Sequence, residues 1–395
     1  MTPKDAILGF ACAFVVAVLA TPLTARLARA VGAVDRPSGR GLAKGDTPLL
    51  GGLAMLAGVL VGAYFFLDGS PRTEHRVDGI LLGAVVIAVV GALDDRFELP
   101  PGIKLGGQIV AAALPVHAGV EVTNITLPFV GAVDFGSLGE PLTILGLVGI
   151  MNVVNFSDGI DGLAAGVCAI AAGVFAVIAF DLERRHAGVL AALTAGAALG
   201  FLVHNFHPAS VFMGDCGSNL LGLLLGCIAV EGAVKTQAVL ALVFPLLVLA
   251  VPFLDTTFVV LKRMKYGRPV WQADANHLHH RFNRIGFSQR RTVMYLYAWT
   301  LTLGAFAIAL RFVPYSDDHG HLNAGWSLVM GSLGLLVVAA SVYLVVVLEI
   351  LKVKRLVWMR RGSGGVMPDE AAVDAEVHEV LATGEFPAVR PQSRP

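Results

Sequence analysis

The sequence predicts an all-α integral membrane protein, a polytopic bundle of about 11 transmembrane helices, on three observations. Of its 395 residues 56% are hydrophobic and only 15% are charged, and its mean hydropathy is +0.73. Soluble surfaces carry about 25–35% charged residues, so this composition excludes most water-soluble folds. Apolar runs of about 20 residues, the length that crosses a bilayer as a helix, recur along the chain. The loops between them are alternately rich and poor in Lys and Arg.

Each predicted span is an apolar run bounded by charged residues, Pro or Gly. In chain order the runs lie at residues 6–27, 49–67, 79–93, 103–120, 142–154, 163–180, 188–203, 218–230, 236–261, 292–312 and 324–348. The fifth and eighth runs are short for a span, so the count of about 11 is accurate to within one. A basic stretch and a Gly/Ser hinge follow the last run. We therefore expect a membrane domain at 1–361 and a cytoplasmic, disordered tail at 362–395.

The Lys and Arg residues indicate which loops face the cytoplasm. They are concentrated in the loops after odd-numbered runs and in the tail, although Arg184 and Arg185 go against this trend. The opposite side carries only Lys4, Arg72, Arg76, Arg184, Arg185, Lys235 and Arg311. By the positive-inside rule the N-terminus lies outside and the C-terminus is cytoplasmic. Lys+Arg and Asp+Glu number 29 each, so no basic surface for nucleic acid is expected. The four scattered cysteines lack metal-binding spacing and are read as apolar packing residues.

Three acidic clusters lie in loops on the predicted cytoplasmic side. They are Asp94-Asp95 after the third run, Asp158 and Asp161 after the fifth, and Asp215 before the eighth. Carboxylates beside glycines suit a hard cation, because glycine lets backbone approach a ligand closely. Mg²⁺ typically takes one or two protein carboxylates together with substrate phosphates. Helix capping explains any one of these residues equally well, but three clusters in a charge-poor chain indicate a site.

The loop between the ninth and tenth runs contains Asp274-Ala-Asn-His277-Leu-His279-His280-Arg281. Imidazole and guanidinium groups can bind a diphosphate or a nucleobase. A transition-metal site is the alternative, but there is no cysteine partner and the acidic clusters favour harder metals. A basic loop that only fixes topology would explain Arg and Lys but not three histidines. Lys44, ahead of a glycine pair, is a weaker candidate at the same surface.

These motifs together resemble the polyprenyl-phosphate N-acetylhexosamine-1-phosphate transferases. The resemblance covers about residues 35–286 and rests on Pro48-Leu-Leu-Gly-Gly52, Leu93-Asp-Asp95, Asn152-Val-Val-Asn-Phe-Ser-Asp-Gly-Ile-Asp-Gly-Leu163, Phe212-Met-Gly-Asp-Cys-Gly-Ser218 and His277-Leu-His-His-Arg281. It implies a multi-pass enzyme of the bacterial plasma membrane that moves a sugar 1-phosphate from a UDP-sugar to a long isoprenoid phosphate. It also implies Mg²⁺, with Mn²⁺ as a substitute, at an active site on the cytoplasmic face.

The resemblance gives each motif residue an expected role. Asp215 is the first candidate for the Mg²⁺ ligand, together with Asp158. Asp94 and Asp95 are expected as catalytic residues near the lipid phosphate, and Asp158 and Asp161 are expected to order the diphosphate, the nucleotide or metal-bound water. The expected substrate-binding residues are Lys44, Lys104, Asn152, Asn155, His277, His279, His280 and Arg281. One-step transfer and an aspartyl-phosphate intermediate are both left open.

Two branches of this family differ in their sugar donor. Phospho-N-acetylmuramoyl-pentapeptide transferases carry Thr-Met-Gly-Gly, Asp-Asp-x-x-Lys and three successive histidines. This chain has Leu50-Gly-Gly, Glu98 in place of that Lys, and Leu278-His-His-Arg281. The departures favour UDP-N-acetylglucosamine as donor and undecaprenyl or decaprenyl phosphate as acceptor, in the first step of a cell-envelope glycan pathway. Transfer of phospho-N-acetylmuramoyl-pentapeptide is the alternative.

Two other classes of protein fit the sequence less well. A lipid or sugar transporter is disfavoured because most acids cluster at one membrane edge and no internal repeat is evident. A non-catalytic scaffold would be expected to lose acids such as Asp94, Asp158 or Asp215, and all three are present. The sequence leaves open whether the protein forms a homodimer.

Overall fold

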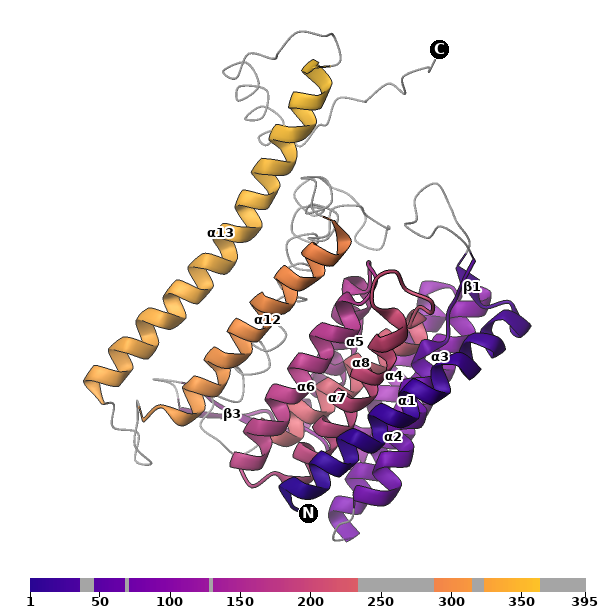
Figure 1. Ribbon diagram of the computed structural model, residues 1–395. Helices are drawn as coiled ribbons and strands as arrows, with labels where there is room; N and C mark the ends of the chain where they lie inside the picture. The colour runs from indigo at the N-terminus through magenta and orange to yellow at the C-terminus, as the bar shows by residue number, and fades with distance from the viewer. Residues whose placement is uncertain (36–45, 68–70, 128–130, 234–287, 315–322, 363–395) are drawn as a thin grey trace, which may run out of the picture.

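The computed structural model describes residues 1–35, 46–67, 71–127, 131–233, 288–314 and 323–362. Ten helices make up most of these residues: α1 (Pro3–Val31), α2 (Gly51–Phe66), α3 (Pro71–Phe97), α4 (Pro101–His117), α5 (Gly139–Ser157), α6 (Leu163–Asp181), α7 (Arg185–Asn205), α8 (Gly214–Ala233), α12 (Gln289–Phe312) and α13 (Ala324–Gly362). They form one bundle, with α12 and α13 along one side (Figure 1). The predicted all-α membrane fold is confirmed.

Among the described residues, eight helices are long and apolar enough to cross a membrane. The other two, α2 with 16 residues and α4 with 17, are shorter. At 1.5 Å per residue they reach about 24–26 Å, somewhat less than a hydrocarbon core of about 30 Å. The apolar run at 236–261 lies outside the described residues, as does the tail from 363 onward. The predicted boundary between membrane domain and tail at 361 stays a prediction.

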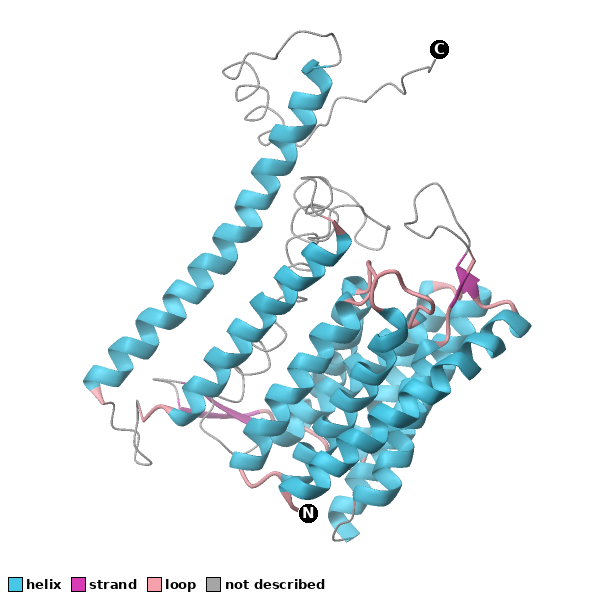
Figure 2. Ribbon diagram, viewed as in Figure 1, coloured by secondary structure: helices cyan, strands magenta, loops and turns pink. Residues whose placement is uncertain are grey.

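The sequence did not predict the two short strand pairs in the loops (Figure 2). β1 (Val34–Asp35) pairs antiparallel with β2 (Thr47–Pro48), and β3 (Asn124–Leu127) pairs antiparallel with β4 (Gly131–Asp134). A 3-10 turn, η1 (Gly136–Leu138), precedes α5. Strands of two to four residues produce no recognisable alternation, because a period of two needs a longer segment to be seen.

Local sequence signals set the ends of α1. The Thr2 side chain accepts a hydrogen bond from the Asp5 amide, and Asp5 accepts one from the Thr2 amide at 2.6 Å. This reciprocal pair satisfies amide groups that have no partner within the helix. At the other end Gly32 takes a left-handed conformation (φ 77°), which ends the helix at little steric cost.

Helices α6, α7 and α8 are mostly buried, whereas α1 and α13 expose more of their surface. Small residues let the central helices approach closely, as is common in membrane proteins. A Cβ atom at Gly196 of α7 would lie 2.2 Å from the Phe10 carbonyl oxygen of α1, and one at Gly200 would lie 2.3 Å from that of Phe14. Larger residues at either position would push α1 away from α7.

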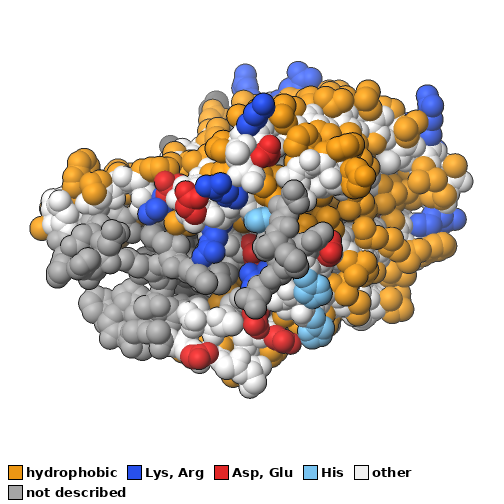
Figure 3. All heavy atoms as spheres, turned by 90° about the horizontal axis from the view of Figure 1, so that it is seen from below, with side chains coloured by type: hydrophobic (Ala, Val, Ile, Leu, Met, Phe, Trp, Pro, Cys, Tyr) orange, Lys and Arg blue, Asp and Glu red, His pale blue; other side chains and the backbone are white. Residues whose placement is uncertain are grey.

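The two ends of the bundle differ. Figure 1 shows the N-terminus at the end opposite β1, and Figure 3 looks onto that N-terminal end, where charged side chains lie between hydrophobic ones. An ion pair joins Arg76 of α3 to Glu231 of α8 at 3.1 Å, and another joins Asp181 of α6 to Arg311 of α12. These charges lie near the ends of the helices, where the interface with water reduces the cost of ionised groups.

At the β1 end, main-chain hydrogen bonds connect segments that are far apart in sequence. The Phe212 amide donates to the Pro48 carbonyl at 2.9 Å, and the Gly51 amide donates back to the Phe212 carbonyl at 3.1 Å. The Gly52 amide donates to the Met213 carbonyl, also at 3.1 Å. The Pro-Leu-Leu-Gly-Gly motif therefore lies directly against the segment that leads into α8.

Candidate active site

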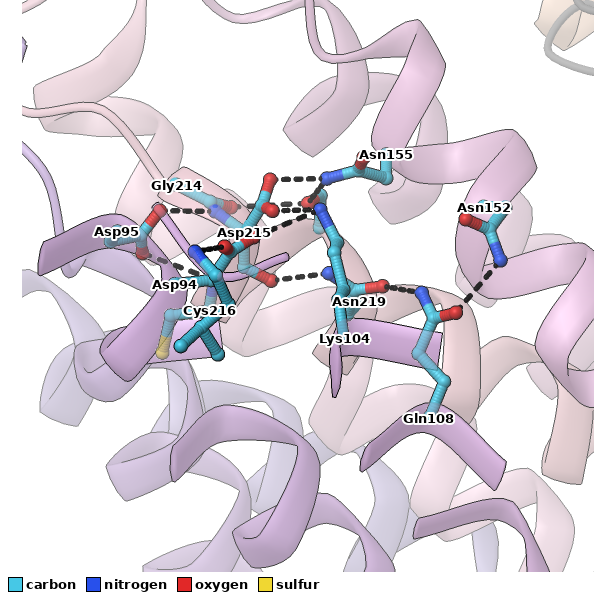
Figure 4. A network of polar contacts seen from close by, with 12 residues as sticks. Asp94, Asp95, Lys104, Gln108, Asn152, Asn155, Gly214, Asp215, Cys216 and Asn219 are labelled. Atoms are coloured by element: carbon cyan, nitrogen blue, oxygen red, sulfur yellow. Dashed lines mark hydrogen bonds and ion pairs between the residues drawn. The ribbon is translucent and has the colours of Figure 1, made fainter. Parts of the chain in front are cut away.

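Four helices bring four of the sequence-predicted residues into one polar cluster (Figure 4). The Lys104 ammonium of α4 lies 3.1 Å from Asp94 Oδ2 of α3, and it also pairs with Asp215 Oδ2 of α8. From α5, Asn155 Nδ2 donates to Asp215 Oδ1 at 2.6 Å and to Ser218 Oγ at 2.8 Å. We refer to Asp94, Lys104, Asn155 and Asp215 as the ionic cluster. Its side chains are partly exposed.

The turn between α3 and α4 fixes Asp94. Its Oδ1 atom accepts a hydrogen bond from the Leu99 amide at 2.7 Å, while Oδ2 faces Lys104. Within this turn Glu98 has a positive φ of 50°, which is uncommon for a residue with a side chain. The Asp94 carboxylate therefore stabilises the turn that brings α4, and with it Lys104, back to the end of α3.

Asp95 plays a different part from its neighbour, because it caps α8. Its Oδ1 atom accepts from the Asp215 amide at 2.7 Å and its Oδ2 atom from the Cys216 amide at 3.1 Å. The first amides of a helix lack partners within the helix, and a carboxylate is favoured there by the helix dipole. Both oxygens of Asp95 are thus occupied by backbone donors. Asp95 holds the residue that carries the Asp215 carboxylate.

Two glycines make this approach of α8 possible. Gly214 has a φ of 67°, and a Cβ atom there would lie 2.3 Å from Asp95 Oδ2. A Cβ atom at Gly52 of α2 would lie 2.3 Å from the Gly217 amide nitrogen. The first turn of α8 therefore fits between α2 and α3 only because these two positions lack side chains.

Asp158 follows the last residue of α5, close to the ionic cluster. Burial, together with repulsion from the carboxylates of Asp215, Asp95 and Asp161, raises the pKa of Asp158 from its ordinary value of 3.8 to about 8. The carboxylates of Asp95, Asp161 and Asp215 therefore disfavour the ionised form of Asp158. A cation bound beside Asp158 would relieve this repulsion.

The Asp158→Asn variant is expected to weaken the pH dependence of stability in protein treated with a chelator. Between about pH 4 and pH 8 the folded form of wild type keeps a proton on Asp158 that the unfolded chain releases, so stability falls as pH rises. The variant should therefore unfold a few degrees higher than wild type near pH 9 and at the same temperature near pH 4. Thermal unfolding in detergent measures this difference. The matched control is Asp134→Asn, which removes an exposed carboxylate on β4; if Asp158→Asn follows the same profile as this control, the expectation is contradicted.

Asp161 bonds to residues outside the ionic cluster. Its Oδ2 atom is 2.7 Å from His207 Nδ1 and accepts from the Ala209 amide at 3.1 Å. Gly162, whose φ is 81°, turns the chain at this point, and its amide donates to Asn205 Oδ1 at 3.0 Å. Asp161 therefore attaches the loop after α5 to the loop before α8.

Sequence reasoning missed several polar residues in and beneath the site. Ser218 accepts from Asn155, His207 faces Asp161, and the buried side chains of Gln108 and Asn219 bond to each other at 2.7 Å. A signal was available, since Gln108 and Asn219 are polar residues in apolar runs, four positions after Lys104 and Asp215. Positions four apart share one helix face.

Of the predicted site residues that remain, the structure describes one, Asn152. Asn152 donates to Gln108 Oε1 at 3.0 Å and to the Val148 carbonyl at 2.8 Å, so it lies one helical turn from Asn155, beneath the ionic cluster. The remaining five lie outside the described residues, and their substrate-binding roles stay predictions: Lys44, His277, His279, His280 and Arg281.

Comparison with known proteins agrees with the motifs. Residues 77–233, which contain the ionic cluster, match the model of glycosyl transferase family 4. The chain is 35% identical over 306 residues to the probable undecaprenyl-phosphate N-acetylglucosaminyl 1-phosphate transferase of Bacillus subtilis, covering 77% of this chain and 85% of that protein. It is 36% identical over 353 residues to the decaprenyl-phosphate N-acetylglucosaminephosphotransferase of Mycobacterium leprae, covering 82% and 88%.

Members of the muramoyl branch are also similar. The phospho-N-acetylmuramoyl-pentapeptide-transferase of Halalkalibacterium halodurans is 34% identical over 284 residues, which is 68% of this chain and 84% of that protein. The predicted resemblance is confirmed. The chain belongs to glycosyl transferase family 4, as its motifs, its multi-pass helical fold and its relatives together show.

Proposed function

We propose that this protein transfers N-acetylglucosamine 1-phosphate from UDP-N-acetylglucosamine to a polyprenyl phosphate, releasing UMP and forming polyprenyl-diphosphate-N-acetylglucosamine. The observation that supports this proposal most directly is the ionic cluster, in which Lys104 lies between the carboxylates of Asp94 and Asp215 at the ends of membrane helices. Such a place suits a reaction between a water-soluble nucleotide and a lipid whose phosphate lies at the membrane surface. Relatives named for this transfer support the choice of substrates.

In the proposed reaction a phosphate oxygen of the lipid attacks the β-phosphorus of the UDP-sugar. The bond from that phosphorus to the bridging oxygen breaks, and UMP leaves with the electron pair. A phosphate monoester has a second pKa of about 6 and is mostly dianionic at neutral pH, so a general base is little needed. Positioning and charge stabilisation are then the main tasks of the protein. Lys104 would pair with phosphate oxygens, while Asp94 and Asn155 keep its surroundings fixed.

The acidic residues also fit a Mg²⁺ ion, for which we propose Asp215 and Asp158 as ligands. Three observations support this: Asp94 and Asp215 already share one cationic group, Asp158 is repelled by its neighbours, and all the donors are carboxylate oxygens. Within the described residues no group of three or more His, Cys, Asp or Glu side chains is arranged to hold a metal. Mg²⁺ commonly takes one or two carboxylates and completes its shell with phosphate and water. When bound, Mg²⁺ or Mn²⁺ would neutralise the charge that develops on the diphosphate.

We further propose that the site faces the cytoplasm of a bacterial cell. α1 begins at the opposite end of the bundle and finishes at the site end, near Arg26 and Arg29, and the last helix also ends there (Figure 1). In the sequence, Lys and Arg are concentrated in the loops after odd-numbered apolar runs, and α1 and α3 correspond to two of these runs. The positive-inside rule places such loops in the cytoplasm, where UDP-sugars are made.

Release of UMP from purified protein tests the proposal. In detergent with Mg²⁺ and decaprenyl or undecaprenyl phosphate, the protein should release UMP from UDP-N-acetylglucosamine and not from UDP-N-acetylmuramoyl-pentapeptide. A lipid-linked product should form in equal amount. Release from the muramoyl donor alone would replace the proposed reaction by that of the second branch. No release from either donor would refute the enzymatic assignment and favour the transporter alternative.

A further inference from the structure

A chain of three side-chain amides lies beneath the ionic cluster (Figure 4). Asn152 Nδ2 donates to Gln108 Oε1 at 3.0 Å, and Gln108 Nε2 donates to Asn219 Oδ1 at 2.7 Å. Asn219 Nδ2 in turn donates to the Asp215 carbonyl at 2.8 Å. Gln108 and Asn219 are each 1% exposed. The amides therefore bond to other protein groups, and their hydrogen bonds all run from donor to acceptor in the order α5, α4, α8.

Each amide lies one helical turn from a member of the ionic cluster. Gln108 follows Lys104 by four residues on α4, and Asn219 follows Asp215 by four on α8. Asn152 precedes Asn155 by three on α5. Residues three or four apart lie on the same face of a helix. The amide chain therefore joins α4, α5 and α8 a second time, one helical turn further into the bundle than the ionic cluster.

This arrangement controls the rotation and depth of α4 more closely than apolar contacts do. Apolar packing is non-directional and tolerates small shifts, whereas a buried amide must keep its donors and acceptors aligned. A rotation of α4 that moved Lys104 away from Asp215 would also break the bonds of Gln108. Gln108 is the central member, because it both accepts from α5 and donates to α8.

We propose that Gln108 is a positioning residue for the transfer reaction: it aligns α4 with α5 and α8 and so places the Lys104 ammonium between its two carboxylates. The proposal rests on the proposed function, because its effect is measured as transfer. A side chain at this position must offer one donor and one acceptor. Size alone does not satisfy that requirement.

The first test compares Gln108→Met with wild type. Methionine has a similar shape but no amide, so the apolar packing of α4 is kept while both hydrogen bonds are lost. The kcat for UMP release should fall by about 10- to 100-fold, the usual effect of removing a partner that orients a site residue. The KM for UDP-N-acetylglucosamine should change much less. Size-exclusion chromatography and thermal unfolding check that the variant is folded.

The second test uses Gln108→Glu as the conservative variant. While protonated, its carboxyl group donates to Asn219 and accepts from Asn152, so Q108E should keep more activity than Q108M. Once ionised it has only acceptors, and the advantage should disappear as pH rises. At the site end, the charged groups on the helices packed against α4 are Asp94, Asp95 and Arg96 of α3 and Asp215 of α8, with Lys104 on α4 itself. Asp158 follows α5 there, whereas Asn152 and Asn155 of α5 are uncharged. At the other end of α4, Glu140 of α5 lies 3.4 Å from His117. Because wild type contains the same groups, activity is expressed relative to wild type at each pH.

Thr194→Val serves as the matched control. It removes a buried hydroxyl of α7 that donates to the Leu190 carbonyl at 2.8 Å, without touching the amide chain, and should keep wild-type activity. Full activity in Q108M would overturn the proposal. Equal losses in Q108M and Q108E at every pH, in step with their loss of stability, would also overturn it. If wild type uses only the muramoyl donor, the proposed function fails, while the same ratios measured with that donor still decide the role of Gln108.

Discussion

Asp215→Asn is expected to abolish transfer, with kcat lowered by at least about 10²- to 10³-fold. Asp215 is the member of the ionic cluster with the most partners: Oδ2 pairs with Lys104, Oδ1 accepts from Asn155, and its amide is held by Asp95. Asparagine keeps the size but replaces one acceptor oxygen by an NH₂ group, which faces another donor. It also removes the charge that would hold Lys104 and the proposed Mg²⁺.

The measurement is UMP release by purified variant and wild type at saturating Mg²⁺. Asp181→Asn is the matched control, because it removes a carboxylate that pairs with Arg311 at the opposite end of the bundle. The control should retain most of its activity. If Asp215→Asn remains fully active, Asp215 has no part in the reaction. If both variants lose activity together with their folded elution peak, the loss reflects folding.

Gly214→Ala is expected to lower activity by a comparable factor, although it removes no functional group. The added methyl group would lie 2.3 Å from Asp95 Oδ2, and the backbone at φ 67° is strained for alanine. Either the capping carboxylate or the first turn of α8 must shift. A displacement of about 1 Å can cost about 100-fold in rate, so the position of Asp215 should be sensitive to this change.

Gly106→Ala is the control for this prediction. Gly106 is an exposed residue in α4 near the site, and a Cβ atom there has nothing within 4 Å. Alanine in a helix interior is favoured over glycine, so this variant should be active and slightly more stable. Kinetics and thermal unfolding of the two variants, measured side by side, check both effects. Wild-type activity in Gly214→Ala would show that the approach of Asp95 to α8 is not required.

Most of the fold was predictable from the sequence because a bilayer imposes a simple length rule. The ten described helices match the apolar runs, and α12 begins within three residues of the predicted position. The ionic cluster was predictable in composition for a related reason, since charged residues are rare in such a chain and cannot lie in lipid without cause. Asp94, Asn155 and Asp215 were named from their motifs and Lys104 from the family resemblance, and the structure brings all four together.

The functions of individual residues within the motifs were less predictable. Neighbouring Asp94 and Asp95 look alike in sequence, but Asp94 faces Lys104 of α4, whereas Asp95 accepts from backbone amides at the start of α8. Asp158 and Asp161 share a motif, yet the turn at Gly162 directs Asp161 toward His207. These differences depend on tertiary contacts between segments more than 40 residues apart, which no local pattern contains.

The main-chain bonds between residues 48–52 and 212–213 have a consequence for how the protein is made. The amide of Gly51 meets the carbonyl of Phe212 only after the intervening 160 residues have been synthesised and inserted into the membrane. Closing so long a loop is entropically costly and is favoured only once the helices around it have packed. A nascent chain that ends before α8 therefore has α2, α3 and Lys104 but lacks Asp215, the group that pairs with Lys104 and accepts from Asn155. The ionic cluster is complete only after translation has passed the eighth helix.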